Sequence, residues 1–357
     1  MLGTIETAQE SILLESYIFS AGALGERFRD ALVRARQRGV RVRVLIDALG
    51  SYGLAATFWD SLRAAGGEVR LFNPLTLDRL GIRNHRKLLV CDNQVAFVGG
   101  FNIASEYEGD GVTCGWCDLG LKVEGPLIKE LVVAFEEMFA RAEFEHKRFV
   151  RLRKARSSRV IQAPREQLLL SGPGRGLNPI KRALRRDLDQ AQSVQMIVAY
   201  FLPTWRLRRQ LAGLARQGCR VQLILAGKSD VRVSLLAARS LYRRLLKAGV
   251  EIYEYQPQVL HAKLYLIDQA VYVGSANLDQ RSLNINYELM IRFDDGPIAT
   301  QAAEVFGNTL KQCRRITLEE YTGARSWWRR LKEHWAYFLL VRIDPYIARR
   351  QWRALPD

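Results

Sequence analysis

One short pattern of residues occurs twice in this chain, and this duplication constrains the fold more strongly than any other feature. The pattern is a histidine, a lysine two positions later and an aspartate five positions after the lysine. Its members are His85, Lys87 and Asp92 in the first half and His261, Lys263 and Asp268 in the second. After each copy, a Gly-Gly or Gly-Ser pair leads to an asparagine, Asn102 or Asn277. The chain holds only four histidines, so two at equivalent positions predict one active site assembled from two half-sites.

The two halves also match outside this pattern. Residues 8–19 align with residues 191–202, which sets Tyr17 opposite Tyr200. Short apolar runs bounded by turn signals predict buried strands, and apolar residues at helical spacing predict helices. The strands are expected at 12–19, 40–47, 68–72, 87–91 and 95–98, and again at 194–201, 219–226, 250–255, 263–267 and 271–274. The helices are expected at 23–38, 126–146, 204–217, 231–247 and 298–313.

Alternating strands and helices indicate an α/β fold. The duplication predicts two lobes, each a mixed β-sheet flanked by helices, related by a pseudo-two-fold axis and sharing one active site. We expect a first lobe over residues 1–150, a basic linker over 151–177, a second lobe over 178–315 and a tail over 316–357. Basic residues far outnumber acidic ones between 141 and 186. The linker is therefore either a solvated surface loop or a contact to phosphates or anionic lipid.

The formal net charge of +17 predicts an anionic partner, which is nucleic acid, an anionic membrane surface or a phosphate substrate. Composition does not choose among these three. The five cysteines are scattered and odd in number, which favours a reducing compartment over a disulfide framework. Cys114 and Cys117 have the spacing of half a zinc site, but no second pair completes it. The cysteine spacing therefore gives little reason to expect a metal or redox role.

The residue types of the repeated pattern suit chemistry at a phosphate ester. Residues two apart on a strand share a face, so each histidine should point the same way as its lysine. Lysines neutralise the non-bridging oxygens of a phosphodiester, and asparagine amides donate hydrogen bonds to them. Two histidines then fit a two-step displacement, in which one attacks phosphorus and the other transfers protons to and from the alcohols.

Four carboxylates accompany the repeated pattern. Asp118 and Glu288 open equivalent strands, and we expect them to orient the two histidines through the second ring nitrogen of each. Asp92 and Asp268 fall at strand ends, so they should brace the backbone by hydrogen bonds rather than touch substrate. Trp116 and the two aligned tyrosines are expected mainly as core aromatics.

Neither end of the chain predicts a membrane-spanning segment. The N-terminus has no basic leader and no apolar core of signal-peptide length. The apolar run at 335–341 is far shorter than the roughly 20 residues that cross a bilayer. Residues 324–353 instead place aromatic and leucine side chains at helical spacing among arginines, which is typical of a membrane-associating interfacial helix. The alternative is a helix docked on the protein core.

The doubled pattern resembles the signature of the phospholipase D superfamily, in which H-x-K-x4-D and G-[GS]-x-N each occur twice. The resemblance covers nearly the whole chain. Stretches similar to bacterial cardiolipin synthases are 15–19, 38–47, 124–126 and 274–288. Residues 228–242 and 326–328 most resemble the shorter cardiolipin synthase B type.

This resemblance implies a phosphatidyltransferase that makes cardiolipin from two phosphatidylglycerol molecules and releases glycerol, through a phosphohistidine. It implies no metal or cofactor. The positions that match the family's catalytic residues are His85, Lys87, Asn102, His261, Lys263 and Asn277. By analogy His85 is favoured as the nucleophile. The expected partners are an anionic phospholipid membrane and phosphatidylglycerol, with no protein partner. The expected location is peripheral, on the cytoplasmic face of the bacterial inner membrane.

Two rival functions stay open at this point. A phospholipase D-type hydrolase or a nuclease would use the same residues with water as the acceptor. The aromatic and basic tail argues against nucleic acid, as does the lack elsewhere of an aromatic-basic stripe suited to base stacking. A non-catalytic lipid- or nucleic-acid-binding scaffold is the second rival, and retention of all six polar pocket residues argues against it.

Overall fold

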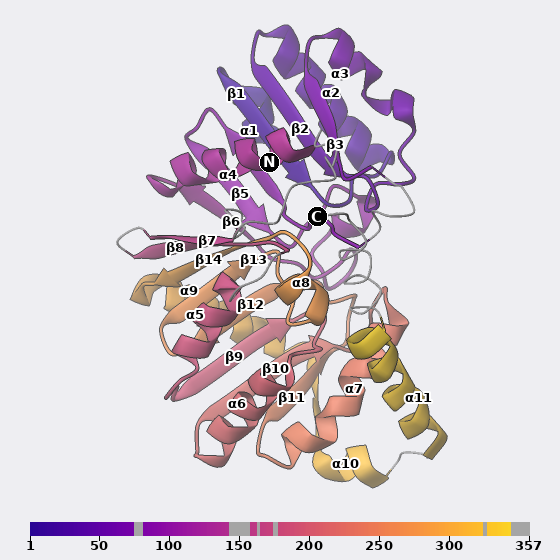
Figure 1. The fold of residues 1–357 in the computed structure, drawn as a ribbon, viewed down its shortest axis with the longest axis vertical. Helices are drawn as coiled ribbons and strands as arrows, with labels where there is room; N and C mark the ends of the chain where they lie inside the picture. The colour runs from indigo at the N-terminus through magenta and orange to yellow at the C-terminus, as the bar shows by residue number, and fades with distance from the viewer. Residues whose placement is uncertain (75–80, 143–157, 163–164, 174–177, 324–326, 344–357) are drawn as a thin grey trace, which may run out of the picture.

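The structure, a computed structural model, describes residues 1–74, 81–142, 158–162, 165–173, 178–323 and 327–343. Two lobes lie one above the other in Figure 1, and each is built on its own β-sheet with helices around it. The α/β fold and its two-lobe organisation are therefore confirmed.

The first lobe carries a six-stranded sheet in the order β3-β2-β1-β4-β5-β6. Its strands are β1 (Ser11–Ser16), β2 (Arg41–Asp47), β3 (Glu68–Phe72), β4 (Leu88–Cys91), β5 (Val95–Gly99) and β6 (Gly120–Glu124). The first three are parallel, and the last three run antiparallel to their neighbours. Helices α1 (Leu2–Thr7), α2 (Ala23–Gln37) and α3 (Asp60–Ala64) pack on one face, and α4 (Leu127–Ala142) packs on the other.

The second lobe repeats this plan with more strands, in the order β15-β11-β10-β9-β12-β13-β14-β8-β7. Its strands are β7 (Arg159–Gln162), β8 (Glu166–Ser171), β9 (Ser193–Val198), β10 (Arg220–Ala226), β11 (Glu251–Tyr255), β12 (Lys263–Ile267), β13 (Ala270–Gly274), β14 (Glu288–Asp294) and β15 (Cys313–Ile316). One face of the sheet packs against α5 (Pro179–Asp187), α6 (Trp205–Arg216) and α7 (Arg232–Leu246), and the other against α9 (Gly296–Leu310).

A single apolar core joins the two lobes. It contains Leu13 and Leu45 from the first sheet together with Ile197 and Ile224 from the second. Helices α4 and α9 contribute to the same core, so both lie between the sheets. This shared core holds the lobes in a fixed relation, which a site assembled from both of them requires.

The predicted basic linker over 151–177 is wrong for much of its length. Its described residues include β7 and β8, which extend the second sheet beyond β14. Leu168, Leu169 and Leu170 of β8 are at most 3% exposed. Successive side chains of a strand point to opposite faces, so this run serves the cores on both sides of the sheet. Residues 151–157, 163–164 and 174–177 lie outside the described residues.

The predicted alignment of Tyr17 with Tyr200 is wrong by one residue. The carbonyls of Ser11 and Ser193 accept equivalent hydrogen bonds from the backbone N–H of Asp92 and Asp268. Counting along the strands from these serines sets Tyr17 opposite Ala199 instead. Each tyrosine nevertheless lies beside the histidine of its own half, with ring centroids 4.9 Å apart for Tyr17 and 6.2 Å apart for Tyr200.

The first half buries a charged network behind its histidine. The Arg86 guanidinium lies 3.1 Å from the Glu15 carboxylate, and the Asn84 amide donates to the same carboxylate at 2.6 Å. Asp47 accepts from the backbone N–H of Asn84 at 2.9 Å and lies 3.4 Å from Arg83. All five residues are at most 3% exposed. The equivalent positions of the second half hold Ile197, Ala226, Val259, Leu260 and Ala262.

This asymmetry predicts how the first half responds to substitution. Glu15→Ile leaves the buried Arg86 guanidinium without its carboxylate, so we expect the free energy of unfolding to fall by about 3–5 kcal/mol. A triple variant, Glu15→Ile with Asn84→Leu and Arg86→Ala, carries the residues of the second half and should recover part of that loss. Denaturant unfolding of the three proteins measures both values. A triple variant less stable than the single one would contradict this account.

Candidate active site

The two histidines lie where the lobes exchange backbone hydrogen bonds. The N–H of His85 donates to the carbonyl of Tyr287 at 3.0 Å, and the N–H of His261 donates to the carbonyl of Cys117 at 2.8 Å. Tyr287 belongs to the second lobe and Cys117 to the first. The segment before each histidine strand is therefore paired with the opposite lobe, in two related places.

This exchange gives each histidine a carboxylate from the other lobe. Nδ1 of His85 lies 3.1 Å from Oε2 of Glu288, and Nδ1 of His261 lies 2.7 Å from Oδ2 of Asp118. Ser275 also donates its hydroxyl to Oε2 of Glu288. Because Nδ1 of each ring is held by a carboxylate, Nε2 is the nitrogen that can meet a substrate. In His261 this Nε2 lies 3.3 Å from the Lys263 ammonium. The expected pairing of both carboxylates with the histidines is present in the structure.

Both lysines are buried beside their histidines. Lys87 and Lys263 are each 1% exposed, and each ammonium donates to the carbonyl of the histidine two residues before it. Burial lowers the pKa of Lys87 to about 7, and it also lowers the pKa of Lys263. The charges of both lysines lower the pKa of His85, so the two half-sites share one electrostatic environment.

The two imidazoles differ in their surroundings. Burial, followed by the charges of Lys87 and Lys263, holds the pKa of His85 well below its usual value. Burial and Lys263 also lower the pKa of His261, but the Asp118 carboxylate opposes them by charge and by hydrogen bonding. His85 is therefore a neutral imidazole near pH 7, whereas His261 has a partner that stabilises its protonated form.

The two asparagines that follow the Gly pairs are buried. Asn102 accepts from the N–H of Ile18 at 3.0 Å, and its amide donates to the Tyr107 hydroxyl at 2.6 Å. Asn277 is 2% exposed, and its Oδ1 has no hydrogen-bond partner among the described residues. An orphaned buried acceptor is costly, so this oxygen is suited to receive a hydrogen bond from a ligand hydroxyl.

Asp92 and Asp268 stand away from this cluster. Asp92 accepts from the N–H groups of residues 9–11, and Asp268 accepts from those of Gln192 and Ser193. Asp92 directly follows the last residue of β4, and Asp268 directly follows the last residue of β12. They fix the start of the first strand in each lobe, as hydrogen-bonding braces would, and do not approach the histidines.

Aromatic side chains line the histidines more closely than expected. The Trp116 ring lies 5.5 Å from that of His261 between centroids, and the Tyr107 ring lies 5.4 Å from it. Tyr107 was not identified from the sequence, because it lies in a segment that has no close counterpart in the second half. Ser275 was also missed, although its place in the Gly-Ser pair beside the motif was a usable signal.

The two cysteines of this segment lie in different surroundings. Cys114 is exposed, whereas Cys117 pairs through its backbone with Leu260, next to His261. Within the described ranges, no group of three or more His, Cys, Asp or Glu side chains could hold a metal ion.

The cluster of His85, Lys87, His261 and Lys263 can bind an anionic phosphodiester with its two lysines and can act on it with its two histidines.

Sequence comparisons place the chain among proteins of the same kind. The family model described as "Cardiolipin synthase, PLD-like domain" matches residues 1–111 and 184–310. The major cardiolipin synthase of Bacillus subtilis is 33% identical over 344 residues, which cover 93% of this chain and 70% of that protein. Cardiolipin synthase B of Salmonella typhimurium is 32% identical over 345 residues, which cover 94% of this chain and 83% of that protein.

Solved structures share the fold at low sequence identity. The phosphatidylserine synthase of Haemophilus influenzae has a TM-score of 0.73 at 15% identity, and the match covers 97% of this chain and 91% of that one. The polyphosphate kinase of Porphyromonas gingivalis has a TM-score of 0.60 at 14% identity, covering 99% of this chain and 50% of that one. The chain belongs to the cardiolipin synthase family within the phospholipase D superfamily, and it is an enzyme of the phosphatidyltransferase type.

Proposed function

We propose that the protein makes cardiolipin from two phosphatidylglycerol molecules and releases glycerol. The observation that carries this proposal is the convergence of two histidines, each bonded to a carboxylate of the opposite lobe, with two buried lysines. The cardiolipin synthases to which the chain is similar support the choice of substrate and product.

In the first step, Nε2 of His85 attacks the phosphorus of one phosphatidylglycerol. A phosphorus–nitrogen bond forms and the bond from phosphorus to the glycerol oxygen breaks. His261, in its imidazolium form, gives its Nε2 proton to the departing oxygen, so free glycerol leaves. Lys87 and Lys263 neutralise the non-bridging oxygens, and the anionic substrate in turn favours their protonated forms.

In the second step, His261 is neutral and accepts the proton of a glycerol hydroxyl on a second phosphatidylglycerol. That hydroxyl oxygen attacks phosphorus, the phosphorus–nitrogen bond breaks, and His85 is restored. Transfer rather than hydrolysis requires that water stay away from the intermediate. The low exposure of the two histidines, 8% for His85 and 4% for His261, supports transfer.

Lipid mass spectrometry tests the proposed reaction directly. The purified protein is incubated with phosphatidylglycerol vesicles, and the expected products are cardiolipin and free glycerol in equal amounts. Phosphatidic acid with glycerol would instead mean that water is the acceptor and the protein is a hydrolase. No change in the lipids would reject both activities on this substrate.

The C-terminal helix supports a peripheral position on a membrane. Helix α11 (Trp327–Phe338) packs on α7, where Ala336 is buried against Ala237. Its other face is exposed to solvent, and the large apolar side chains there are Trp327, Trp328, Leu331, Trp335 and Phe338. One face of this helix is thus docked on the protein, and the exposed apolar side chains of the other face support the proposed interfacial role. Residues 324–326 and 344–357 of the tail lie outside the described residues.

Exposed tryptophans on a protein of net positive charge favour binding at the interface of an anionic bilayer. No helix in the described part of the chain is long and apolar enough to span a membrane. Because of the exposed aromatic face of α11, we place the protein on the membrane surface, with phosphatidylglycerol drawn from that surface. The cytoplasmic face is the better choice, because it is the reducing side and five free cysteines suit it.

The exposed face of α11 gives a testable prediction. Replacing Trp327, Trp328 and Trp335 with alanine should weaken binding to phosphatidylglycerol vesicles by at least about tenfold, since each indole contributes apolar area at the interface. Cosedimentation with vesicles measures the binding. Turnover of a soluble short-chain phosphodiester is the control and should stay within about twofold of the parent protein. Unchanged vesicle binding would assign the helix to the protein core alone.

A further inference from the structure

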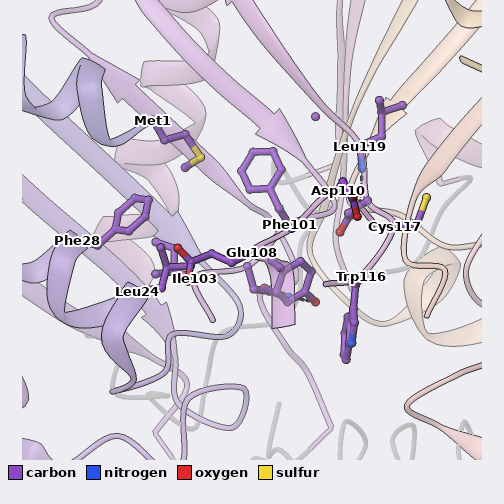
Figure 2. A pocket seen from close by; sticks show the side chains of 15 residues that line it. Met1, Leu24, Phe28, Phe101, Ile103, Glu108, Asp110, Trp116, Cys117 and Leu119 are labelled. Atoms are coloured by element: carbon purple, nitrogen blue, oxygen red, sulfur yellow. Dashed lines mark hydrogen bonds between the residues drawn. The ribbon is translucent and has the colours of Figure 1, made fainter. Parts of the chain in front are cut away.

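A cavity of about 350 Å³ lies beside the cluster on the first-lobe side. Asn102 and Asp118 form its end at the site, and its apolar lining residues include Leu24, Phe28 and Ile103. Figure 2 shows Leu24 and Phe28 on their helix at one side of the cavity, with Ile103 beside them, and Trp116 on a loop at the other side. The cavity therefore leads away from the reacting groups into apolar surroundings.

The carboxylates in the wall of this cavity already have partners. Glu108 forms an ion pair with Arg27 at 2.8 Å. Asp110 accepts hydrogen bonds from the N–H groups of Val112 and Thr113 within its own turn. Asp118 bonds His261. These carboxylates would repel a phosphate, and their hydrogen bonds and ion pair are already made without a cationic ligand. The space therefore suits an uncharged and apolar group.

The cavity is bounded by a segment that breaks the repeat. Residues 103–117 connect Asn102 to Asp118, whereas the shorter run 278–287 connects Asn277 to Glu288. The longer segment is folded tightly on itself at Gly109, whose backbone has a φ of +142° and where an added Cβ would lie 2.3 Å from the Cys114 carbonyl. In the second lobe, the short run forms α8 (Gln280–Asn284) instead.

We propose that this cavity receives one acyl chain of the phosphatidyl group whose phosphorus is held by the histidines. The inference rests on the proposed function, and it adds the position of one acyl chain of the bound substrate. A chain that leaves the glycerol backbone near His261 passes Tyr107 and Trp116, whose rings face that histidine. It then continues past Ile103 toward Leu24 and Phe28 of α2, where its methylenes exchange water for apolar contact.

Filling the far end of the cavity tests the proposal. Leu24→Trp places an indole in the path of the chain, and Glu26→Trp is the matched control, because Glu26 is exposed on the same helix and does not line the cavity. Rates are measured with dioleoyl and with dibutanoyl phosphatidylglycerol in the same detergent. Each methylene that loses its burial costs roughly fourfold in binding. We expect Leu24→Trp to lower kcat/KM for the long-chain substrate at least about tenfold, and for the short-chain substrate by no more than about twofold.

The outcomes separate this proposal from the proposed function. Equal losses on both substrates, or an equal effect of Glu26→Trp, would overturn the acyl-chain assignment while leaving the reaction intact. A parent protein that converts neither substrate would reject the proposed function first. Phe28→Ala provides the opposite change, because it lengthens the cavity. It should shift the preference toward longer saturated chains, and an unaltered chain-length profile would also count against the assignment.

Discussion

Replacing either His85 or His261 with alanine should lower turnover of phosphatidylglycerol by at least about 10³-fold, and the two variants should fail at different steps. His85→Ala removes the proposed nucleophile, so no covalent intermediate should form. His261→Ala removes the proposed proton donor, which the first step needs only when the leaving alcohol must be protonated. A phosphatidyl ester of p-nitrophenol bypasses that need, because p-nitrophenolate leaves as a stable anion without being protonated.

With the nitrophenyl ester, His261→Ala should release a burst of p-nitrophenolate that approaches one equivalent of enzyme. The phosphatidyl group should then remain on the protein, because the second alcohol lacks a base, and peptide mass spectrometry should locate it on His85. His85→Ala should show neither burst nor adduct. An adduct on His261 in the reciprocal variant would reverse the two roles. The exposed His334 of α11 provides a matched histidine-to-alanine control, and thermal unfolding checks that each variant is folded.

Much of the site was predictable because its residues repeat. A single His-x-Lys is weak evidence for a catalytic site, but a second copy at the equivalent position of the other half argues against chance as its cause. The repeat also identified Asp118 and Glu288, which occupy equivalent positions, as partners of the histidines. Strands such as β12, found at the predicted residues Lys263–Ile267 and buried throughout, were predictable because buried strands are short apolar runs between turns. Which carboxylate bonds which histidine was not predicted, because the pairing of each histidine with the carboxylate of the opposite lobe depends on how the two lobes meet.

Other features could not be predicted from the sequence, each for a physical reason. The strand β8 was hidden because its apolar core, Leu168 to Leu170, lies within a strongly basic stretch that favours a solvated loop. The buried pair of Glu15 and Arg86 was unexpected because charged side chains are rarely buried unless they are paired, and pairing is a matter of three-dimensional contact. Tyr107 approaches His261 through the fold of a segment that the repeat does not cover.

The two carboxylates that hold the histidines should not be equally important. Burial raises the pKa of Glu288 to about 8, so this side chain largely keeps its proton near pH 7. Glutamine is a neutral isostere of that form and can still accept from Nδ1 of His85. We therefore expect Glu288→Gln to lower turnover by no more than about tenfold. Asp118→Asn removes the charge that stabilises the imidazolium of His261, and should lower turnover by about 10²- to 10⁴-fold.

The pH dependence of kcat/KM distinguishes this effect from general damage. The Asp118 charge raises the pKa of His261, so removing it should lower that pKa. The proposed first step needs His261 protonated. As the pH rises, activity in Asp118→Asn should therefore begin to fall at a lower pH than in the parent protein. Glu288→Gln should leave this limb of the profile in place. Equal losses for the two variants would mean that the histidines are electrostatically equivalent, and a larger loss for Glu288→Gln would assign the proton transfers to His85.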